Sequence, residues 1–335
     1  MKTGEVMRGR LRYYLIGFGL GCLLLIVLPR PIRRSGIEKD PGAFHGHYPV
    51  RIDDGFGREV EVNYRPRRII SLAPSVTEIL FRLGGEKQLV GNTKFCSYPP
   101  GAEAIEKVGG IRQPSLEKII QLQADVVLGT VLSPVSLYER FEAMNIKAIA
   151  FRHGDFEGVL EDIRSIGRIT GKIGETIRLI SSIEEKRQRI EERLRNKVNK
   201  PRPRVVLLYG LRGLYSAGAG SWAGDLIELC HADNIAASAS STWPQLSLEG
   251  ILVADPEVLI LAVPTKDQGL WESGDELLLL RKDEVWRNVS AVRNGRVEVI
   301  DSEILEIPGP RMIDALETLA RAIHPELFEQ SGHIP

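Results

Sequence analysis

The chain has 335 residues, of which 43% are hydrophobic and 26% are charged, a composition typical of globular proteins and not of disordered or fibrous ones. The length is enough for two ordinary domains. The formal net charge is zero, so no overall basic field indicates a nucleic-acid partner, and three cysteines are too few for a disulfide framework.

The N-terminus has the pattern of an export signal. Residues 1–12 carry four basic side chains against one acidic side chain, and residues 13–28 form an uncharged, mostly apolar run that ends before further arginines. A basic start before an apolar run is typical of such signals and keeps the start in the cytoplasm. We therefore predict a signal anchor or signal peptide over residues 1–28. An uncleaved anchor over 13–28, a cleaved signal and lipid attachment at Cys22 stay open.

Residues 29–49 are rich in proline, glycine and charge, which predicts a linker. Residues 50–170 then alternate short apolar segments with helical patterns. In the helix that follows the third strand, Ser75 and Glu78 have the spacing of a capping box. Strands are expected at 50–54, 58–62, 68–72, 89–91, 125–128 and 145–151. This alternation predicts an α/β lobe with a mainly parallel sheet and helices on both faces.

Residues 171–200 predict one long helix that connects this lobe to a second one. Ile173, Ile177, Ile180 and Ile183 have helical spacing, and the remainder is mostly charged. A helix of this kind is typical of a solvated bridge between two domains.

Residues 201–330 repeat the alternation of strands and helices and predict a second α/β lobe. Residues 115–128 align without a gap on residues 247–260, and five of the fourteen aligned pairs are identical. Together with the two α/β halves, this repeat indicates two related lobes. A cleft between such lobes is the expected ligand site.

Four stretches then carry a family resemblance: RIISLAPSVTEILF at 68–81, VGGI followed by PSLEKIIQLQADVVL at 108–128, WPQLSLEGIL from Trp243, and PGPRMIDAL from Pro308. Over about residues 50–328 the chain resembles the cobalamin, siderophore and haem class of periplasmic binding proteins. The resemblance implies two lobes joined by one rigid helix. It also implies an extracytoplasmic substrate-binding component of an ABC importer, which captures a cobalamin-like corrinoid or an iron chelate and needs no cofactor of its own. The implied partners are a permease dimer with its ATPase subunits, and the membrane through the N-terminus.

The resemblance also suggests ligand-binding residues. Trp243 matches a ligand-contacting tryptophan of cobalamin-binding members. Phe95 and Tyr98 lie in the loop that carries a contact tyrosine in those members, with Phe95 at the tyrosine's position, and Ile111 stands where a further tryptophan can occur. These two departures leave open whether the ligand is cobalamin, a siderophore or haem.

Further ligand candidates follow from residue type and position. Tyr215 and Trp222 flank a glycine-rich loop in the second lobe, although core packing would explain either aromatic residue. Arg112 and Arg311 are polar candidates, because arginine suits an acidic chelate. His153 or Tyr215 could serve as an axial ligand if the ligand is haem. Arg311 can equally be interpreted as a residue that caps the structure near the last helix.

Glu117 and Glu249 occupy equivalent positions of the internal repeat. The resemblance implies that one glutamate of each lobe docks onto arginines of the permease. Exposed charged pairs contribute mainly orientation and association rate, which suits such a role. The alternative is that each glutamate stabilises the dipole of its own helix.

Two other classes of function compete with an importer component. Residues 218–224 approach a dinucleotide-binding loop, but the glycine spacing is one residue too long and the following acidic residue is missing. No motif has catalytic spacing and the six histidines are scattered, so we predict neither an enzyme nor a resident metal site. A membrane-tethered sensing module without transport, and a chelatase-like metal-insertion enzyme, remain as alternatives.

Overall fold

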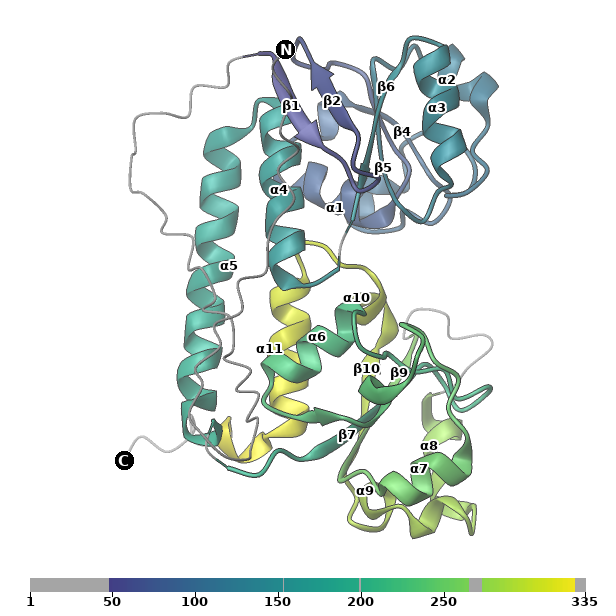
Figure 1. Ribbon diagram of the computed structural model, residues 1–335, viewed down its shortest axis with the longest axis vertical. Helices are drawn as coiled ribbons and strands as arrows, with labels where there is room; N and C mark the ends of the chain where they lie inside the picture. Colours follow the sequence, from purple (N-terminus) through teal and green to yellow (C-terminus); the bar gives the residue numbers. More distant parts are fainter. Residues whose placement is uncertain (1–47, 153, 199, 265–272, 329–335) are drawn as a thin grey trace, which may run out of the picture. The chain divides into compact units, whose positions relative to one another are not determined.

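The computed structural model describes residues 48–152, 154–198, 200–264 and 273–328 (Figure 1). The predicted signal or anchor at 1–28, most of the linker at 29–49 and His153 lie outside these ranges. No helix within the described ranges has the length and apolar character needed to span a membrane.

The first lobe is built on a parallel sheet of four strands in the order β4-β3-β5-β6, preceded by an antiparallel hairpin of β1 and β2. Successive strand residues point to opposite faces, so Val126 and Leu128 pack in one core and Val127 in another. Its elements are β1 (Val50–Asp53), β2 (Glu59–Val62), β3 (Ile69–Ser71), α1 (Pro74–Arg82), β4 (Leu89–Asn92), α2 (Leu116–Gln121), β5 (Val126–Thr130), α3 (Val135–Ala143), β6 (Lys147–Phe151) and α4 (Phe156–Thr170).

The second lobe has the same architecture, with a parallel sheet in the order β10-β9-β7-β8. Its elements are β7 (Arg204–Leu208), α6 (Trp222–Leu229), β8 (Asp233–Asn234), α7 (Leu248–Ala254), β9 (Val258–Val263), α8 (Ser273–Lys282), α9 (Ser290–Arg293), β10 (Val297–Asp301), α10 (Ser302–Glu306) and α11 (Met312–Ile323). Two parallel sheets flanked by helices confirm the predicted fold class.

The internal repeat extends to backbone details. Helix α2 leads into β5 as α7 leads into β9, and the residues that end the two helical turns, Gln123 and Asp255, both have a left-handed backbone with φ of 48° and 42°. Read from the edge strands β4 and β8, the orders β4-β3-β5-β6 and β8-β7-β9-β10 are the same: in each sheet the strands occur as second, first, third and fourth along the chain. The two lobes therefore share one topology.

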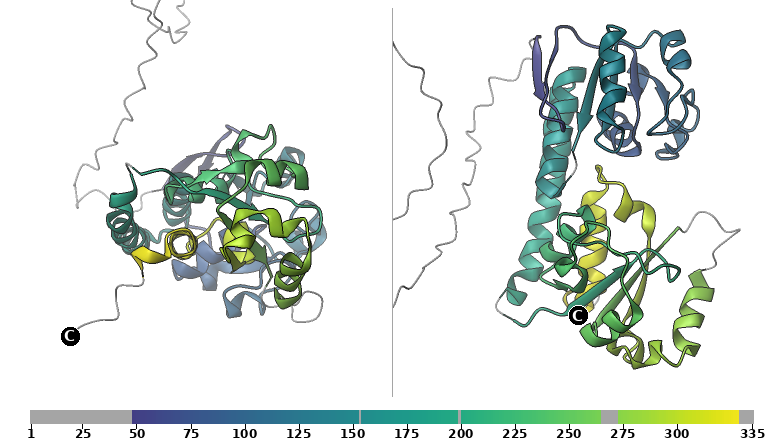
Figure 2. Two further views of the ribbon diagram at one scale, coloured as in Figure 1. Left: turned by 90° about the horizontal axis from the view of Figure 1, so that it is seen from below. Right: turned by 45° about the vertical axis from the view of Figure 1, so that its right-hand side comes forward.

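A single long helix, α5 (Ile173–Leu194), follows α4 and packs against α4 and α11 (Figures 1 and 2). The prediction of a solvated bridge is right for most of the second half, whose charged residues are exposed or partly exposed, and wrong for Ile190 and Leu194, which are buried. Ile177, which the pattern assigned to the apolar face, is 51% exposed. Periodicity identified the helix, whereas the packing of α11 decided which of its faces is covered.

One hydrophobic core runs through α4, α5, α6 and α11 and takes in buried strand residues of both sheets. Charged residues of α5 add to this connection: Lys186 donates to Asp314 on α11 at 2.7 Å, and Arg187 pairs with Glu157 on α4. Because the interior of a protein is densely packed, a continuous core opposes hinge bending at α5.

The predicted capping box at Ser75 and Glu78 is wrong. Helix α1 begins at Pro74, its N-cap is Ala73, and no side chain caps it. Proline at a first helical position has the φ angle that a helix needs, so the start requires no serine cap. Glu78 instead binds Arg311 of the second lobe.

Candidate functional site

A cavity of about 550 Å³ lies at the carboxyl end of the first sheet, where β4 and β5 end. Two of the predicted ligand residues, Phe95 and Arg112, meet there, and Phe95 is 52% exposed. Leu132, which the sequence did not suggest, is 65% exposed in the same cavity. The full lining is Lys94, Phe95, Gly110, Ile111, Arg112, Gln113 and Leu132. These described residues include two cations and no carboxylate, so the cavity combines apolar contact with positive charge.

The loop that carries Phe95 is held in place by Lys107. The ammonium group of Lys107 donates hydrogen bonds to Asn92 Oδ1 at 2.8 Å and to the carbonyls of Cys96 and Ala102 at 3.0 and 2.9 Å. A lysine has three donors, and all three are used here. The loop is thereby tied to the end of β4, and Phe95 is presented on a fixed support.

Three aromatic residues meet at the carboxyl end of β7 in the second lobe. Tyr209 directly follows this strand and donates its backbone N–H to the carbonyl of Tyr215 at 2.9 Å. Its ring lies 5.8 Å from the ring of Trp243, centre to centre. Tyr215 and Trp243 are 51% and 49% exposed. Two predicted residues therefore share one aromatic group, which we call the Trp243 group (Tyr209, Tyr215 and Trp243).

Sequence reasoning missed Tyr209, although an aromatic residue directly after a buried strand is a usable signal for the ligand edge of a parallel sheet. Burial raises the pKa of its hydroxyl, and the charge of Glu306 adds to the effect. Trp222, another aromatic candidate, is 3% exposed at the start of α6 and belongs to the core.

Tyr98 does not join Phe95 in the cavity. Its ring lies 4.0 Å from the guanidinium of Arg311. Arg311 donates to Glu78 through Nε at 3.0 Å and Nη2 at 2.6 Å, and it lies 3.3 Å from Glu303. The Glu78 side chain is 1% exposed. Arg311 therefore holds the two lobes together at a buried ion pair. It occupies the N-cap position of α11 without a capping side-chain hydrogen bond, and a ligand role for it stays a prediction.

Glu117 and Glu249 lie at matching places on α2 and α7, one residue beyond the start of each helix. Each helix is capped by a serine: Ser115 Oγ accepts from Lys118 N at 3.3 Å, and Ser247 Oγ accepts from Gly250 N at 3.0 Å. Both glutamates are exposed. This placement is compatible both with docking onto a partner and with stabilisation of the dipole of each helix.

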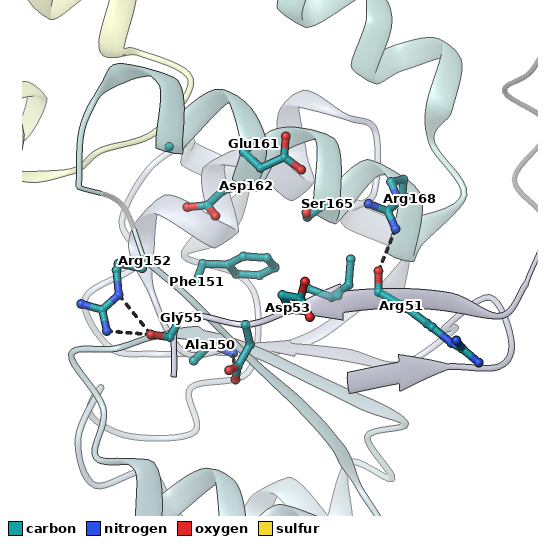
Figure 3. Close-up of a pocket in the computed structure, with 13 residues that line it drawn as sticks. Arg51, Asp53, Gly55, Ala150, Phe151, Arg152, Glu161, Asp162, Ser165 and Arg168 are labelled. Carbon is teal, nitrogen blue, oxygen red and sulfur yellow. Dashed lines mark hydrogen bonds between the residues drawn. The ribbon is translucent and has the colours of Figure 1, made fainter. Parts of the chain in front are cut away.

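A second cavity in the first lobe, of about 480 Å³, lies between β1, the end of β6 and α4 (Figure 3). Its arginines bind backbone carbonyls: Arg152 Nη2 donates to Gly55 O at 2.6 Å and Arg168 Nη2 to Arg51 O at 2.7 Å. None of the predicted ligand residues lines it. These contacts hold the β1–β2 hairpin on the lobe, so the cavity has a structural explanation.

Cys96 and Cys230 are buried and free, and burial raises the pKa of the Cys230 thiol. Among the residues that the structure describes, no group of three or more histidine, cysteine, aspartate or glutamate side chains could hold a metal ion.

The comparisons with known proteins agree with this architecture. The chain is 27% identical over 289 residues to the ABC transporter substrate-binding lipoprotein YvrC of Bacillus subtilis, covering 84% of this chain and 88% of that protein. It is 28% identical over 282 residues to a cobalamin-binding protein of Halobacterium salinarum, covering 83% and 74% of the two chains. The structure of the periplasmic haem-binding protein RhuT of a Roseiflexus species matches with a TM-score of 0.66 at 27% identity, over 78% of this chain and 99% of that one.

A family model for periplasmic binding proteins matches residues 69–304. The matched region includes both sheets, helix α5, the cavity at Phe95 and the Trp243 group. The chain belongs to the periplasmic binding protein family.

Proposed function

We propose that this chain is the substrate-binding component of an ABC importer. It captures a cobalamin-like corrinoid or an iron chelate outside the cytoplasmic membrane and delivers it to the permease. Family membership and relatives named for cobalamin, haem and ABC transport support this function. The observation that carries the proposal is that large aromatic side chains stand exposed at the carboxyl ends of both sheets.

The position of these side chains has a physical meaning. In parallel α/β sheets, ligands bind outside the carboxyl ends of the strands. Apolar side chains left open to water there offer contact area to a macrocycle or an aromatic chelate. Trp243 and Tyr215 would contact the ligand from the second lobe, and Phe95 from the first. Arg112 would pair with acidic groups at the ligand's edge.

Delivery would depend on the outer surfaces of the two lobes. Glu117 and Glu249 would contact basic side chains of the permease, one from each lobe. The continuous core at α5 would keep the two glutamates at a fixed spacing during binding and release. An N-terminal anchor over residues 13–28 would raise the concentration of the loaded protein at the permease.

The first test is ligand binding by the full chain in detergent micelles. Cyanocobalamin, haem and a panel of ferric siderophores would be titrated while tryptophan fluorescence is followed. We expect one class to bind, and Trp243→Ala to weaken that ligand about thirtyfold or more, as hot-spot residues do. Tyr64→Ala is the matched control, because Tyr64 is 45% exposed and lies outside both ligand groups. Binding by none of the three classes would contradict the proposal.

A second test separates capture from delivery. Reversing both charges, Glu117→Lys with Glu249→Lys, should abolish uptake of the ligand identified in the first test and leave its affinity unchanged. The measurements are uptake of radiolabelled ligand by cells and titration of the purified variant. A parallel loss of ligand affinity would show that the glutamates belong to the binding site or to the fold, and not to docking.

A further inference from the structure

We infer that the docking surface includes an exposed aliphatic side chain beside each glutamate, Ile120 on α2 and Val253 on α7. This inference rests on the proposed function, since its partner is the outer face of the permease. Each lobe would present the same pair of groups, one carboxylate and one apolar side chain, on the surface of a short helix.

The first observation is exposure. Val253 is 88% exposed, which is the highest value among the large hydrophobic side chains of the described residues, and Ile120 is 54% exposed. Both helices already have a separate apolar face that packs inward, because Ile119 on α2 and Ile251 on α7 are fully buried. Ile120 and Val253 therefore contribute little to the core, and the fold does not require an aliphatic residue at either place.

The second observation is position. Residues three or four apart lie side by side on a helix, so Ile120 is a neighbour of Glu117 and Val253 is a neighbour of Glu249. Single apolar residues scattered over a surface are ordinary. Here the same combination occurs on the equivalent helices of both lobes. The two positions are not aligned in the repeat, because Val253 aligns with Gln121, so an inherited core position does not explain them.

The third argument is energetic. Exposed ion pairs contribute little to affinity because water and salt screen them, so two glutamates alone would orient the protein without holding it. Burial of an aliphatic side chain contributes affinity that salt does not screen. A partner that fits has basic groups next to an apolar contact, repeated twice, as in a permease made of two equivalent subunits.

The test uses the full-length chain and the permease complex that cross-links to it, purified into nanodiscs. The dissociation constant would be measured from about 0.05 to about 0.5 M salt. We expect Ile120→Gln and Val253→Gln each to weaken binding about tenfold at every salt concentration. Glu117→Lys with Glu249→Lys should abolish binding at low salt. Ile177→Gln, which removes a 51% exposed isoleucine from α5, is the matched control and should have no effect.

The outcomes separate this inference from the proposed function. If the charge reversal abolishes binding while Ile120→Gln and Val253→Gln bind as the unmodified chain does, the inference is wrong and the proposed function stands. If the unmodified chain binds no permease at all, both are wrong. If sedimentation shows a dimer that only the two glutamine variants lose, with permease affinity unchanged, the aliphatic residues serve self-association and the inference is wrong.

Discussion

The two lobes share a scaffold and differ at the edge that would face a ligand. In the first lobe Arg68 Nε donates to the carbonyl of Leu122 at 2.7 Å, and in the second Arg204 Nε donates to the carbonyl of Ala254 at 3.0 Å. These carbonyls occupy aligned positions of the repeat. An arginine at the start of the first parallel strand, directly before β3 in one lobe and at the first residue of β7 in the other, therefore closes the end of the same helix in both lobes.

The carboxyl ends of the strands show no such agreement. The first lobe has Phe95 beside two basic residues, whereas the second has the Trp243 group, which is aromatic. Contacts that stabilise the scaffold are repeated, and contacts available to a ligand are not. The comparison teaches that the duplicated unit supplies fold and outer surface, while unrelated loops supply the two halves of the candidate binding site.

The largest effect on the free energy of unfolding is expected at the ion pair between the lobes, Arg311 with Glu78. Arg311→Met leaves the buried Glu78 carboxylate without both guanidinium hydrogen bonds, and such losses destabilise proteins by about 3–5 kcal/mol. Chemical denaturation with urea would measure the change in the free energy of unfolding. The control is Arg51→Met, which removes an ion pair with the exposed Glu61 and should change the free energy of unfolding far less. Equal effects of the two substitutions would contradict a special role of the ion pair between the lobes.

The second prediction separates ligand contact from core packing with two tryptophans of the same lobe. Trp243→Ala should leave the free energy of unfolding almost unchanged and cost about 2 kcal/mol or more of ligand binding, because Trp243 is half exposed. Trp286→Ala should leave ligand binding almost unchanged and destabilise the fold by about 3–5 kcal/mol, because Trp286 is 7% exposed and packs in an apolar core of the second lobe. Thermal unfolding and titration calorimetry on both variants would check the contrast. A loss of fold stability in Trp243→Ala would overturn it.

The third prediction sharpens the comparison of the two scaffolds. The Asp125 carboxylate accepts two backbone hydrogen bonds, from Arg67 N at 2.9 Å and Arg68 N at 3.1 Å. The aligned Glu257 accepts one, from Arg204 N at 3.0 Å. Asp125→Ala should therefore destabilise by about 1–2 kcal/mol and Glu257→Ala by at most about 1 kcal/mol. Urea unfolding of both variants measures the difference, and the opposite order would contradict the assignment of the larger stabilisation to the carboxylate with two backbone hydrogen bonds.

The smallest expected effect is a loss of folding stability at acidic pH that arises from His324. His324 is 3% exposed, its Nε2–H donates to the carbonyl of Cys230 at 2.8 Å, and burial lowers its pKa below the ordinary value of about 6.5. Below that value the unfolded chain binds a proton that the folded chain does not, so stability falls as the pH drops towards the lowered pKa. The loss is at most about 1.4 kcal/mol per pH unit.

His324→Gln should remove this slope, which urea unfolding at a series of pH values would measure. The first lobe provides the contrast. Burial opposes ionisation of Asp54, but hydrogen bonds from Arg58 outweigh it and lower the pKa of the carboxyl. That contribution is complete above the ordinary pKa of about 3.9 and disappears as the pH falls through the lowered value. A slope that persists near pH 6 in His324→Gln would show that other groups titrate there.

Local pattern was enough to predict much of the fold. Most of the strands, the long helix and the repeat between 115–128 and 247–260 all follow from neighbours within a few residues. Hydrophobic periodicity and capping chemistry act over that range, so they can be read without knowing the rest of the chain. The same reasoning placed Glu117 and Glu249 on equivalent first turns.

Partners distant in sequence could not be predicted in this way. Glu78 had the spacing of a local cap, yet its partner Arg311 is 233 residues away. The sequence by itself determined the periodic elements, the duplicated scaffold and the exposed glutamates. Only the tertiary structure decided that Phe95, Arg112 and Leu132 line one cavity while Tyr98 lies under Arg311. The reason is that a local pattern depends on neighbours along the chain, whereas a cavity or a buried ion pair depends on where distant segments cross.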